Sequence, residues 1–420
     1  MRTGLNWLGK DLTNPIVLAS ITAISHKRLD EHVSFYEKAA DMGAGAIVLE
    51  SVVPIEFGNE TFGFTQNDLV AIESGLGEKQ YMGFALMGPP YPNISSIKYG
   101  RRLIVELRKK TKVPLIGSIV NYGTEALMIR SAEILAESGV DGLELNFSCP
   151  NITNLQDKDI NENYSVILPS ALLLEEIRNK TGLKISLKIS PNNNSLEALL
   201  QDEVILSKVD GISYANAYSG LLPPSLSEPF GGKFGRGATW APTGVYGPLE
   251  RMFTFNKLVE MKSIPKLSKL EISVIGGIVS KEHPIEALLL GATTVQISSG
   301  ILWKSLRLIK ESVKFLDEFM QKFGFKAIND FRGISLPLVT SNAQNVLEYR
   351  ENATKKNNQR MFMSISDNCI KCGRCMDCCC LAIKKNKSGN LYVEHELCSG
   401  CGWCIYKCEK NAIKRVEAED

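Results

Sequence analysis

The chain has 420 residues, more than one compact core usually holds, so we expect more than one domain. Basic and acidic residues nearly balance, and the formal net charge of +2 gives no indication of nucleic acid or a membrane surface as a partner. Residues 1–15 contain no apolar run long enough for a signal peptide or a membrane span. We therefore expect a soluble, cytoplasmic protein.

A short hairpin is predicted over residues 5–14, and from there to about residue 322 short apolar runs alternate with amphipathic stretches. The clearest helices are Glu125–Ser138 and Leu172–Lys180, where apolar residues recur at three- and four-residue spacing. About eight strand–helix units over roughly 300 residues predict a parallel α/β fold, the TIM (β/α)8 barrel. The alternative is an open doubly wound sheet, but no G-x-G-x-x-G follows the first strand. The predicted strands are Ile16–Ser20, Ala46–Glu50, Leu115–Val120, Gly142–Phe147, Ile185–Ile189, Gly211–Asn216, Ser273–Gly276 and Thr294–Ser298.

The segment 143–151 (LELNFSCPN) begins as an alternating apolar run and ends in Ser-Cys-Pro-Asn, which favours a turn. It contains Cys149, the only cysteine among the first 368 residues. A lone cysteine is often no more than a small buried hydrophobe. Two asparagines and a serine within three residues of the sulfur indicate instead a polar site where a strand opens into a loop.

In a TIM barrel the catalytic groups lie at the carboxyl ends of the strands. The predicted strands end in more polar residues and glycines than packing alone requires. After the sixth strand, residues 217–241 form a long insertion rich in glycine and proline, which is either disordered or, as we favour, a loop that covers the site. The residues at these strand ends are Ala19, Ser20, Glu50, Ser51, the segment 146–151, Lys188, Asn216, Gly276, Gly277, Ser298 and Ser299.

Ten of the eleven cysteines lie between Cys369 and Cys408, which in a cytosolic chain is more typical of a metal site than of disulfides. The spacing C-x2-C-x2-C-x3-C occurs twice, as in bacterial ferredoxins with two [4Fe–4S] clusters, where the fourth thiolate of each motif reaches the other cluster. Zinc knuckles are the alternative. Cys378 and Cys380 are left over by this spacing. The choice of Cys379 as the fourth ligand of the first motif therefore stays open, because a cysteine stands on either side of it. We assign one cluster to Cys369, Cys372, Cys375 and Cys408, and the other to Cys398, Cys401, Cys404 and Cys379.

Two turns, 275–278 (IGGI) and 296–300 (QISSG), follow the seventh and eighth strands, where TIM barrels commonly bind phosphate. Gly276-Gly277 alone could be a simple tight turn, but the Ser-Ser-Gly turn on the next strand favours a phosphate group. A phosphate-bearing cofactor fused to two electron carriers indicates FMN, which accepts a hydride and passes on single electrons. We therefore predict an FMN-binding barrel over residues 1–322, a linker over 323–366, and a small α+β domain with two [4Fe–4S] clusters over 367–420.

At this point the motifs resemble, in chain order, those of the dihydroorotate dehydrogenase family. With the cysteine-rich tail, the layout is most similar to the dihydropyrimidine dehydrogenases. The motifs are ASI (19–21), ELNFSCPN (144–151), SLKISPN (186–192), ANAYSG (215–220), VIGGI (274–278) and VQISSGI (295–301).

The resemblance implies that Cys149 is the acid and base at C5 of a dihydropyrimidine ring, while a hydride moves between ring C6 and FMN N5. It also implies that Asn146, Asn151 and Asn216 hydrogen-bond the ring, since a side-chain amide offers both donor and acceptor. Lys188 would lie near the N1–C2=O edge of the flavin. From the residues alone, Lys188 could be a snorkelling lysine and Asn216 a turn-capping amide. The other implied FMN-binding residues are Ala19, Ser20, Glu50, Gly237, Gly276, Gly277, Ser298 and Ser299.

Three residues depart from the family pattern. Glu50 stands where a lysine is usual, and it would repel the carboxylate of orotate unless it is protonated or paired. Ala217 replaces a hydroxyl residue, and Ile21 replaces a glycine. We therefore expect a neutral, uracil- or thymine-like ring as substrate. The alternatives are a dihydroorotate dehydrogenase and a subunit that only relays electrons.

No nicotinamide-binding fingerprint is present. The expected electron partner is therefore a separate NAD(P)H-oxidising flavoprotein subunit or a small ferredoxin. Such a partnership predicts a homo- or hetero-oligomer.

Overall fold

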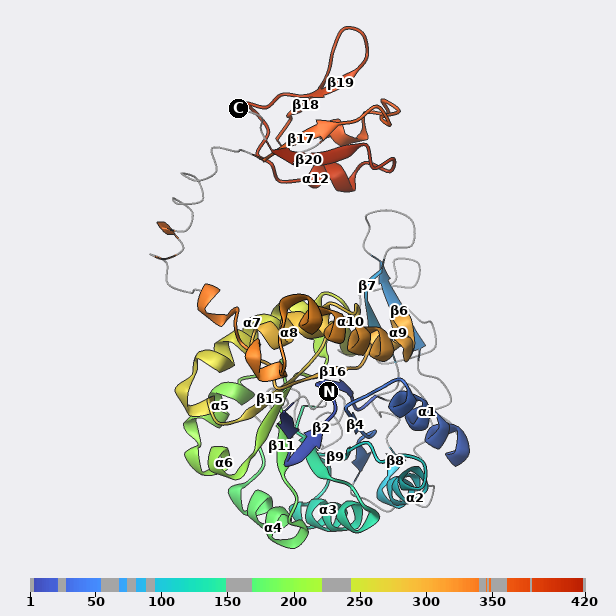
Figure 1. Ribbon diagram of the computed structural model, residues 1–420, viewed down its shortest axis with the longest axis vertical. Helices are drawn as coiled ribbons and strands as arrows, with labels where there is room; N and C mark the ends of the chain where they lie inside the picture. The colour runs from blue at the N-terminus through green and yellow to red at the C-terminus, as the bar shows by residue number, and fades with distance from the viewer. Residues whose placement is uncertain are drawn as a thin grey trace, which may run out of the picture. The chain divides into compact units, whose positions relative to one another are not determined.

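The protein is described here by a computed structural model. Within the described residues no helix is both long and apolar enough to cross a lipid bilayer. They form two compact units, the first ending at Pro337 and the second beginning at Leu338 (Figure 1). The described residues are 4–21, 28–53, 68–73, 81–87, 95–148, 168–220, 243–339, 345, 347–348, 361–377 and 380–417.

The centre of the first unit is a closed barrel of eight parallel strands. Each strand pairs with the next in the order given below, and the last pairs back with the first. The predicted TIM barrel is confirmed, and the alternative of an open sheet is wrong. The strands are β3 (Ile16–Leu18), β4 (Ala46–Val48), β9 (Leu115–Val120), β10 (Gly142–Asn146), β11 (Ile185–Lys188), β12 (Gly211–Tyr214), β15 (Glu271–Ile275) and β16 (Thr294–Ile297).

Helices surround the barrel (Figure 1). Three of them begin at the hydroxyl residues Ser96, Thr124 and Ser170, whose side chains accept a backbone N–H of the first turn. The α-helices of this unit are α1 (Leu29–Asp41), α2 (Ile97–Arg108), α3 (Glu125–Ser138), α4 (Ala171–Thr181), α5 (Ser195–Gln201), α6 (Glu203–Lys208), α7 (Glu250–Ser263), α8 (His283–Leu289), α9 (Gly300–Lys304) and α10 (Arg307–Phe323). Short 3-10 turns are η2 (Pro265–Leu267), η3 (Ile328–Asp330) and η4 (Leu336–Leu338).

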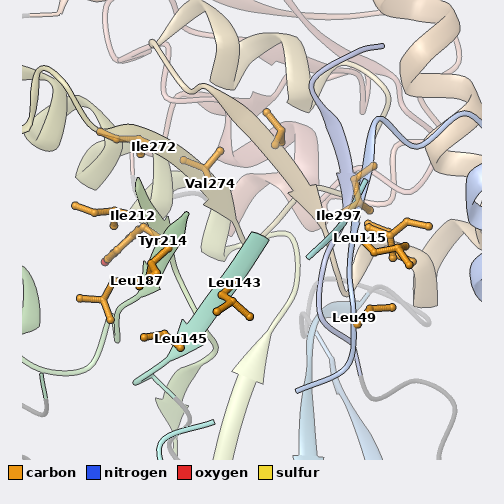
Figure 2. Packing of buried hydrophobic residues seen from close by; sticks show 14 of the residues in the cluster. Leu49, Leu115, Leu143, Leu145, Leu187, Ile212, Tyr214, Ile272, Val274 and Ile297 are labelled. Carbon is orange, nitrogen blue, oxygen red and sulfur yellow. The ribbon is translucent and has the colours of Figure 1, made fainter. Parts of the chain in front are cut away.

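Alternate residues of each barrel strand point to opposite sides of the sheet, either outward to the helices or inward to the barrel interior. Leu143 and Leu145 of β10 belong to the apolar layer between strands and helices, part of which Figure 2 shows. Glu144 and Asn146, between and beyond them, are also buried but face the barrel interior. The outer layer therefore supplies the hydrophobic stabilisation, and the inner layer is left free to be polar.

The amino-terminal hairpin seals one end of the barrel. It consists of β1 (Leu5–Trp7) and β2 (Lys10–Leu12), close to the predicted hairpin over residues 5–14. Its apolar side chains pack against Val17, Ala46, Val48 and Ile116, on the strands β3, β4 and β9. Because this plug lies at the amino ends of the strands, only the carboxyl ends can open into a site.

Further short strands lie around the carboxyl ends of the barrel strands. β5 (Val52–Val53) pairs with β9 and with β8 (Ser95–Ser96). A separate antiparallel sheet combines two strands that follow β12 in the chain with two that precede β9. It includes the first residues of the predicted loop 217–241, whose residues 221–241 lie outside the described part. It comprises β13 (Tyr218–Gly220), β14 (Thr243–Tyr246), β7 (Tyr81–Met87) and β6 (Asp68–Glu73).

The second unit is a small α+β domain with the predicted ferredoxin-type organisation. β17 (Met361–Ile365) pairs with β20 (Ile413–Glu417), and β18 (Ile383–Lys385) pairs with β19 (Leu391–Val393), both antiparallel. A short helix, α12 (Trp403–Tyr406), and a 3-10 turn, η5 (Arg374–Asp377), each carry cysteines. The core of this domain contains Met363, Cys375, Ile383, Cys404 and Ile413. Cysteine side chains thus take up part of the volume that larger hydrophobes fill elsewhere.

Replacing Leu145 by alanine should destabilise the barrel by about 2–5 kcal/mol, because it removes a fully buried side chain of the outer layer and leaves a cavity. Chemical unfolding followed by circular dichroism measures the change. Leu172→Ala is the matched control, since Leu172 is 65% exposed on α4 and should change stability by less than about 0.5 kcal/mol. Equal losses in the two variants would contradict the layer assignment.

Candidate active site and cysteine cluster

Three serines form the first part of a hydrogen-bonded network at the mouth of the barrel. Ser51 donates its backbone N–H to Ser20 Oγ at 3.1 Å, and the two hydroxyl oxygens are 3.2 Å apart. The Ser51 hydroxyl also lies 2.8 Å from the Ser118 hydroxyl, on β9. The ends of β3, β4 and β9 are therefore joined by hydroxyl groups. Ser20 was predicted as a site residue, whereas Ser118 was not.

The network continues through the two predicted substrate-binding asparagines that are described. Asn146 Nδ2 donates to Ser51 Oγ at 3.2 Å, and its Oδ1 accepts from both the backbone N–H and the hydroxyl of Ser148, at 3.2 and 2.7 Å. Asn216 Nδ2 donates to Ser148 Oγ at 3.0 Å, and its Oδ1 accepts the Ala217 N–H at 2.8 Å. Ser148 thus links the ends of β10 and β12.

The predicted catalytic residue Cys149 follows Ser148 directly in the sequence, but it lies outside the described residues. The same is true of Asn151 and Gly237. Their roles therefore stay predictions. The described part of the hydrogen-bonded network reaches Ser148, the residue before Cys149.

Below the mouth, the barrel interior holds an ion pair. Lys188 Nζ lies 3.8 Å from Glu144 Oε1, and the two side chains are 5% and 0% exposed. The other carboxylate oxygen of Glu144 accepts from Gln296 Nε2 at 3.2 Å. Gln296 Nε2 also donates to Ser273 Oγ at 3.0 Å. Lys188, predicted to face the flavin, is therefore held in a buried polar array and is not a snorkelling side chain at the surface.

Sequence reasoning did not single out Glu144 or Gln296. Each lies in a short apolar run, LELN for Glu144 and VQIS for Gln296. In a barrel strand the apolar neighbours must face the helices, so a polar residue between them must face the interior. This signal was present in the sequence, and it also identifies Ser118 in LIGSIV.

Glu50 lies at the end of β4, but its described contacts are with helix α1. Its carboxylate is 3.6 Å from Nε2 of the buried His32, and its backbone N–H donates to the Tyr36 hydroxyl at 2.9 Å. His32 Nδ1 in turn lies 3.1 Å from the Tyr99 hydroxyl, on α2. A contact between Glu50 and a flavin stays a prediction, and His32 is an ionic partner of this carboxylate only when its imidazole is protonated.

The two predicted phosphate-binding turns approach their neighbours closely. Gly276 and Gly277 have φ of +118° and +71°, which other residues rarely adopt. A Cβ on Gly277 would lie 2.2 Å from the Arg251 backbone nitrogen, and one on Gly300 would lie 2.0 Å from the Ile278 carbonyl oxygen. Ser298 and Ser299 come directly before Gly300, so serines and glycines occur together at the carboxyl ends of β15 and β16. This donor set suits a phosphate ester.

Glu250, the first residue of α7, is hydrogen-bonded to several segments around the Gly276-Gly277 turn. Its buried carboxyl receives hydrogen bonds from the backbone N–H groups of Gly247, Tyr218 and Gly277. It thereby joins the ends of β14 and β13 to the Gly276-Gly277 turn. Burial raises the pKa of Glu250 to about 8, against an ordinary value of 4.5, although the three N–H groups lower it.

The second unit brings cysteines of both motifs together. Cys369, Cys372, Cys375 and Cys408 line a cavity of about 80 Å³. Burial raises the pKa of Cys375, and the other three thiols raise it further. Four thiols around a small cavity suit an iron–sulfur cube, and backbone N–H groups of Lys371 and Ala412 already point at two of the sulfurs, those of Cys369 and Cys408.

The thiols assigned to the second cluster are described only in part. Cys404 is buried in the core of the domain, Cys398 packs against that core, and Cys401 is exposed. Cys379 and Cys378 lie outside the described residues. Cys380, the other spare cysteine, packs partly against the same core.

A closed barrel with a polar mouth, together with a cysteine-rich domain of ferredoxin type, is typical of an oxidoreductase. The sequence pattern of the dihydroorotate dehydrogenase family matches residues 4–320, and that of a 4Fe-4S binding domain matches residues 391–414. The chain therefore belongs to the dihydroorotate dehydrogenase family. The 4Fe-4S match includes Cys398, Cys401, Cys404 and Cys408.

Similar proteins fall into two groups. One is the NAD-dependent dihydropyrimidine dehydrogenase subunit PreA of Escherichia coli, 25% identical over 254 residues, which are 59% of this chain and 57% of that protein. The other group contains catalytic subunits of dihydroorotate dehydrogenase B (NAD(+)). The Thermoplasma volcanium protein is 26% identical over 78% of this chain and 96% of its own length, and the Pyrococcus furiosus protein is 25% identical over 80% and 99%.

Glu250→Gln should remove a pH-dependent cost to stability. Folded Glu250 keeps its proton up to about pH 8, whereas an unfolded glutamate loses it near 4.5, so the free energy of unfolding falls as the pH rises through this window. At about 1.4 kcal/mol per pH unit, the upper bound on this fall is roughly 5 kcal/mol. The variant cannot ionise, so its melting temperature relative to wild type should rise between pH 5 and pH 9.

Thermal unfolding at several pH values tests this expectation. Glu260→Gln, at a more exposed position on α7, is the control and should follow the wild type at every pH. A constant difference between Glu250→Gln and wild type across the range would contradict it.

Proposed function

We propose that this chain is the catalytic part of an FMN-dependent oxidoreductase that interconverts a pyrimidine and its 5,6-dihydro form. The observation that carries the proposal is the network from Ser51 through Asn146 and Ser148 to Asn216. It holds two amide side chains at the carboxyl end of a family-matched barrel, next in sequence to Cys149. Fixed amides beside a thiol suit a small heterocycle that must be oriented before a proton is moved.

FMN, when bound, supplies the two-electron acceptor for a hydride and passes single electrons onward. In the proposal, the close-packed turns at Gly276-Gly277 and Ser298-Ser299 hold its phosphate, and Lys188 provides positive charge toward its ring. Ala19 and Ser20 are proposed to contact the flavin from the end of β3, where Ala19 donates its N–H to the Ile297 carbonyl at 3.0 Å. Gly237 completes the proposed set.

Cys149 is proposed to hold or take the proton at ring C5, while Asn146, Asn151 and Asn216 orient the ring. A cysteine thiol has an ordinary pKa of about 8.5, so it can exchange a proton near neutral pH. Ala217 contributes no hydroxyl, but its backbone N–H fixes the Asn216 amide. Asn146 and Asn216 are therefore held by the protein before the ring arrives.

Electrons are proposed to leave through two [4Fe–4S] clusters. The first is held by Cys369, Cys372, Cys375 and Cys408, which line one cavity. The second is held by Cys379, Cys398, Cys401 and Cys404. The proposed partner is an NAD(P)H-oxidising flavoprotein subunit or a small ferredoxin, in a homo- or hetero-oligomer. The name of the PreA relative describes a subunit of an NAD-dependent enzyme, which supports a partner of this kind.

A second candidate function is oxidation of dihydroorotate. Two observations favour it. The relatives named dihydroorotate dehydrogenase B are matched over 96% and 99% of their length, against 57% for PreA. In addition, Glu50 lies 3.6 Å from Nε2 of His32, and a protonated His32 would weaken the repulsion that we expected between Glu50 and the carboxylate of orotate. Substrate turnover has to decide between the two rings.

Anaerobic addition of a reduced pyrimidine to the purified chain should bleach the flavin absorption. We expect dihydrouracil or dihydrothymine to do so at least ten times faster than dihydroorotate, because a neutral ring needs no counter-charge at the mouth. The reverse order would establish the second candidate. No bleaching by any of the three would show a subunit that only relays electrons.

Cys149→Ala serves as the control within this experiment. It should abolish bleaching by the preferred substrate and leave the flavin absorption itself unchanged, since the thiol moves a proton and does not hold the cofactor. Unchanged bleaching in this variant would remove Cys149 from the proposed role.

Cys408→Ala should lower the iron and labile sulfide content by about half, because Cys408 lines the cavity of the first cluster with three other thiols. The measurement is iron and sulfide per chain, with the spectrum of the reduced clusters. Cys380→Ala is the matched control, and it should keep the full content. If Cys380→Ala loses as much iron as Cys408→Ala, the assignment of the ligands is wrong.

A further inference from the structure

We propose that Glu144 is a positioning residue that acts through Lys188 to keep a positive charge at the floor of the active site. The inference rests on the proposed FMN site and adds a residue to it. Its basis is the buried carboxylate of Glu144, which does not itself contact a reacting group. This carboxylate lies next to Lys188, the one cation among the described site residues.

The strand register places Lys188 and Glu144 at different depths. Lys188 lies opposite Asn146, at the level of the mouth, whereas Glu144 lies opposite Ser186, one inward-facing residue deeper. Despite this offset between their backbones, the two charged groups are 3.8 Å apart. The backbone of Lys188 is level with that of Asn146, which belongs to the network at the mouth.

Glu144 is itself fixed from the opposite wall of the barrel. Gln296 Nε2 donates to Glu144 Oε2 at 3.2 Å and to Ser273 Oγ at 3.0 Å, and Ser273 also accepts from Thr294 Oγ1 at 2.7 Å. Glu144 Oε1, the oxygen nearest Lys188, has no hydrogen-bond partner among the described residues. Glu144 Oε2 is therefore hydrogen-bonded to Gln296, whereas Oε1 faces only the Lys188 ammonium group among the described residues.

Electrostatics explains why such a pair is needed. A buried ammonium group without a carboxylate partner is strongly unfavourable, because water no longer solvates it. Such a lysine responds by losing its proton or by moving toward water. Glu144 prevents both, since it compensates the charge and its position is set by Gln296. A neutral residue of equal size at position 144 would fill the same volume and provide neither effect.

Glu144→Gln tests the inference, since it keeps the size of the side chain and removes its charge. The measurement is the midpoint potential of the bound flavin from pH 6 to pH 9, in wild type, Glu144→Gln, Lys188→Met and the double variant. We expect Glu144→Gln to behave like wild type at the acid end and like Lys188→Met at the alkaline end. The change should be at least tenfold in the reduced-to-oxidised equilibrium, which is about 30 mV for a two-electron couple.

The double variant shows whether Glu144 acts through Lys188. Adding Glu144→Gln to Lys188→Met should cause no further change in potential. A further change there, or a wild-type potential in Glu144→Gln at every pH, would overturn the inference. Wild-type protein that binds no flavin would overturn the proposed function instead, which separates the two failures.

If Glu144→Gln does not fold, Glu144→Asp takes its place. It keeps the charge but withdraws the carboxylate by one methylene group. The same pH-dependent change is then expected with a smaller size, and an unchanged potential would overturn the inference. Where both variants fold, the change in Glu144→Asp should be smaller than the change in Glu144→Gln.

Discussion

The hydrogen bond from Gln296 to Glu144 crosses the interior of the barrel. β16 and β10, which carry these residues, are separated by three strands in either direction around the ring. The contact can form only if the sheet is closed and its interior is narrow enough for two side chains to meet. Closure of the barrel therefore decides which groups lie below the mouth, and the charge of Lys188 depends on it through Glu144.

The polar interior is possible because the barrel is stabilised elsewhere. The outward-facing residues of the strands and the helices form one continuous apolar layer. The amino-terminal hairpin fills one end of the interior with Trp7 and leucines. Buried polar groups are costly unless they are paired, and the serines and asparagines of the interior are hydrogen-bonded to one another, while Glu144 lies opposite the Lys188 ammonium group. Stability and chemistry are thus assigned to opposite faces of the same strands.

The sequence was sufficient for the architecture, because alternation and the spacing of apolar runs are local signals. All eight barrel strands were predicted near their observed positions, and helix α3 was predicted with its observed bounds. The cysteine spacing similarly indicated that Cys408 belongs with Cys369, Cys372 and Cys375, and the structure places these four thiols around one cavity.

The direction of individual side chains could not be predicted in the same way. Glu50 ends a strand whose alternation would turn it inward, yet its described contacts are with His32 and Tyr36 of α1. That outcome depends on which helix residues pack behind the strand, and no local pattern specifies them. The partners of Ser51 and Gln296 likewise come from strands far apart in the sequence, so their pairing required the register of the closed sheet.

The network also limits what the two asparagines can offer a ligand. Asn146 Oδ1 already accepts two hydrogen bonds from Ser148, which is the capacity of an amide oxygen. Asn216 Oδ1 accepts the Ala217 N–H. Each amide nitrogen carries a second N–H beyond the one it donates within the network. The pair therefore presents mainly donors to the mouth, and an edge with carbonyl oxygens, such as that of a pyrimidine ring, is the chemical complement of that arrangement.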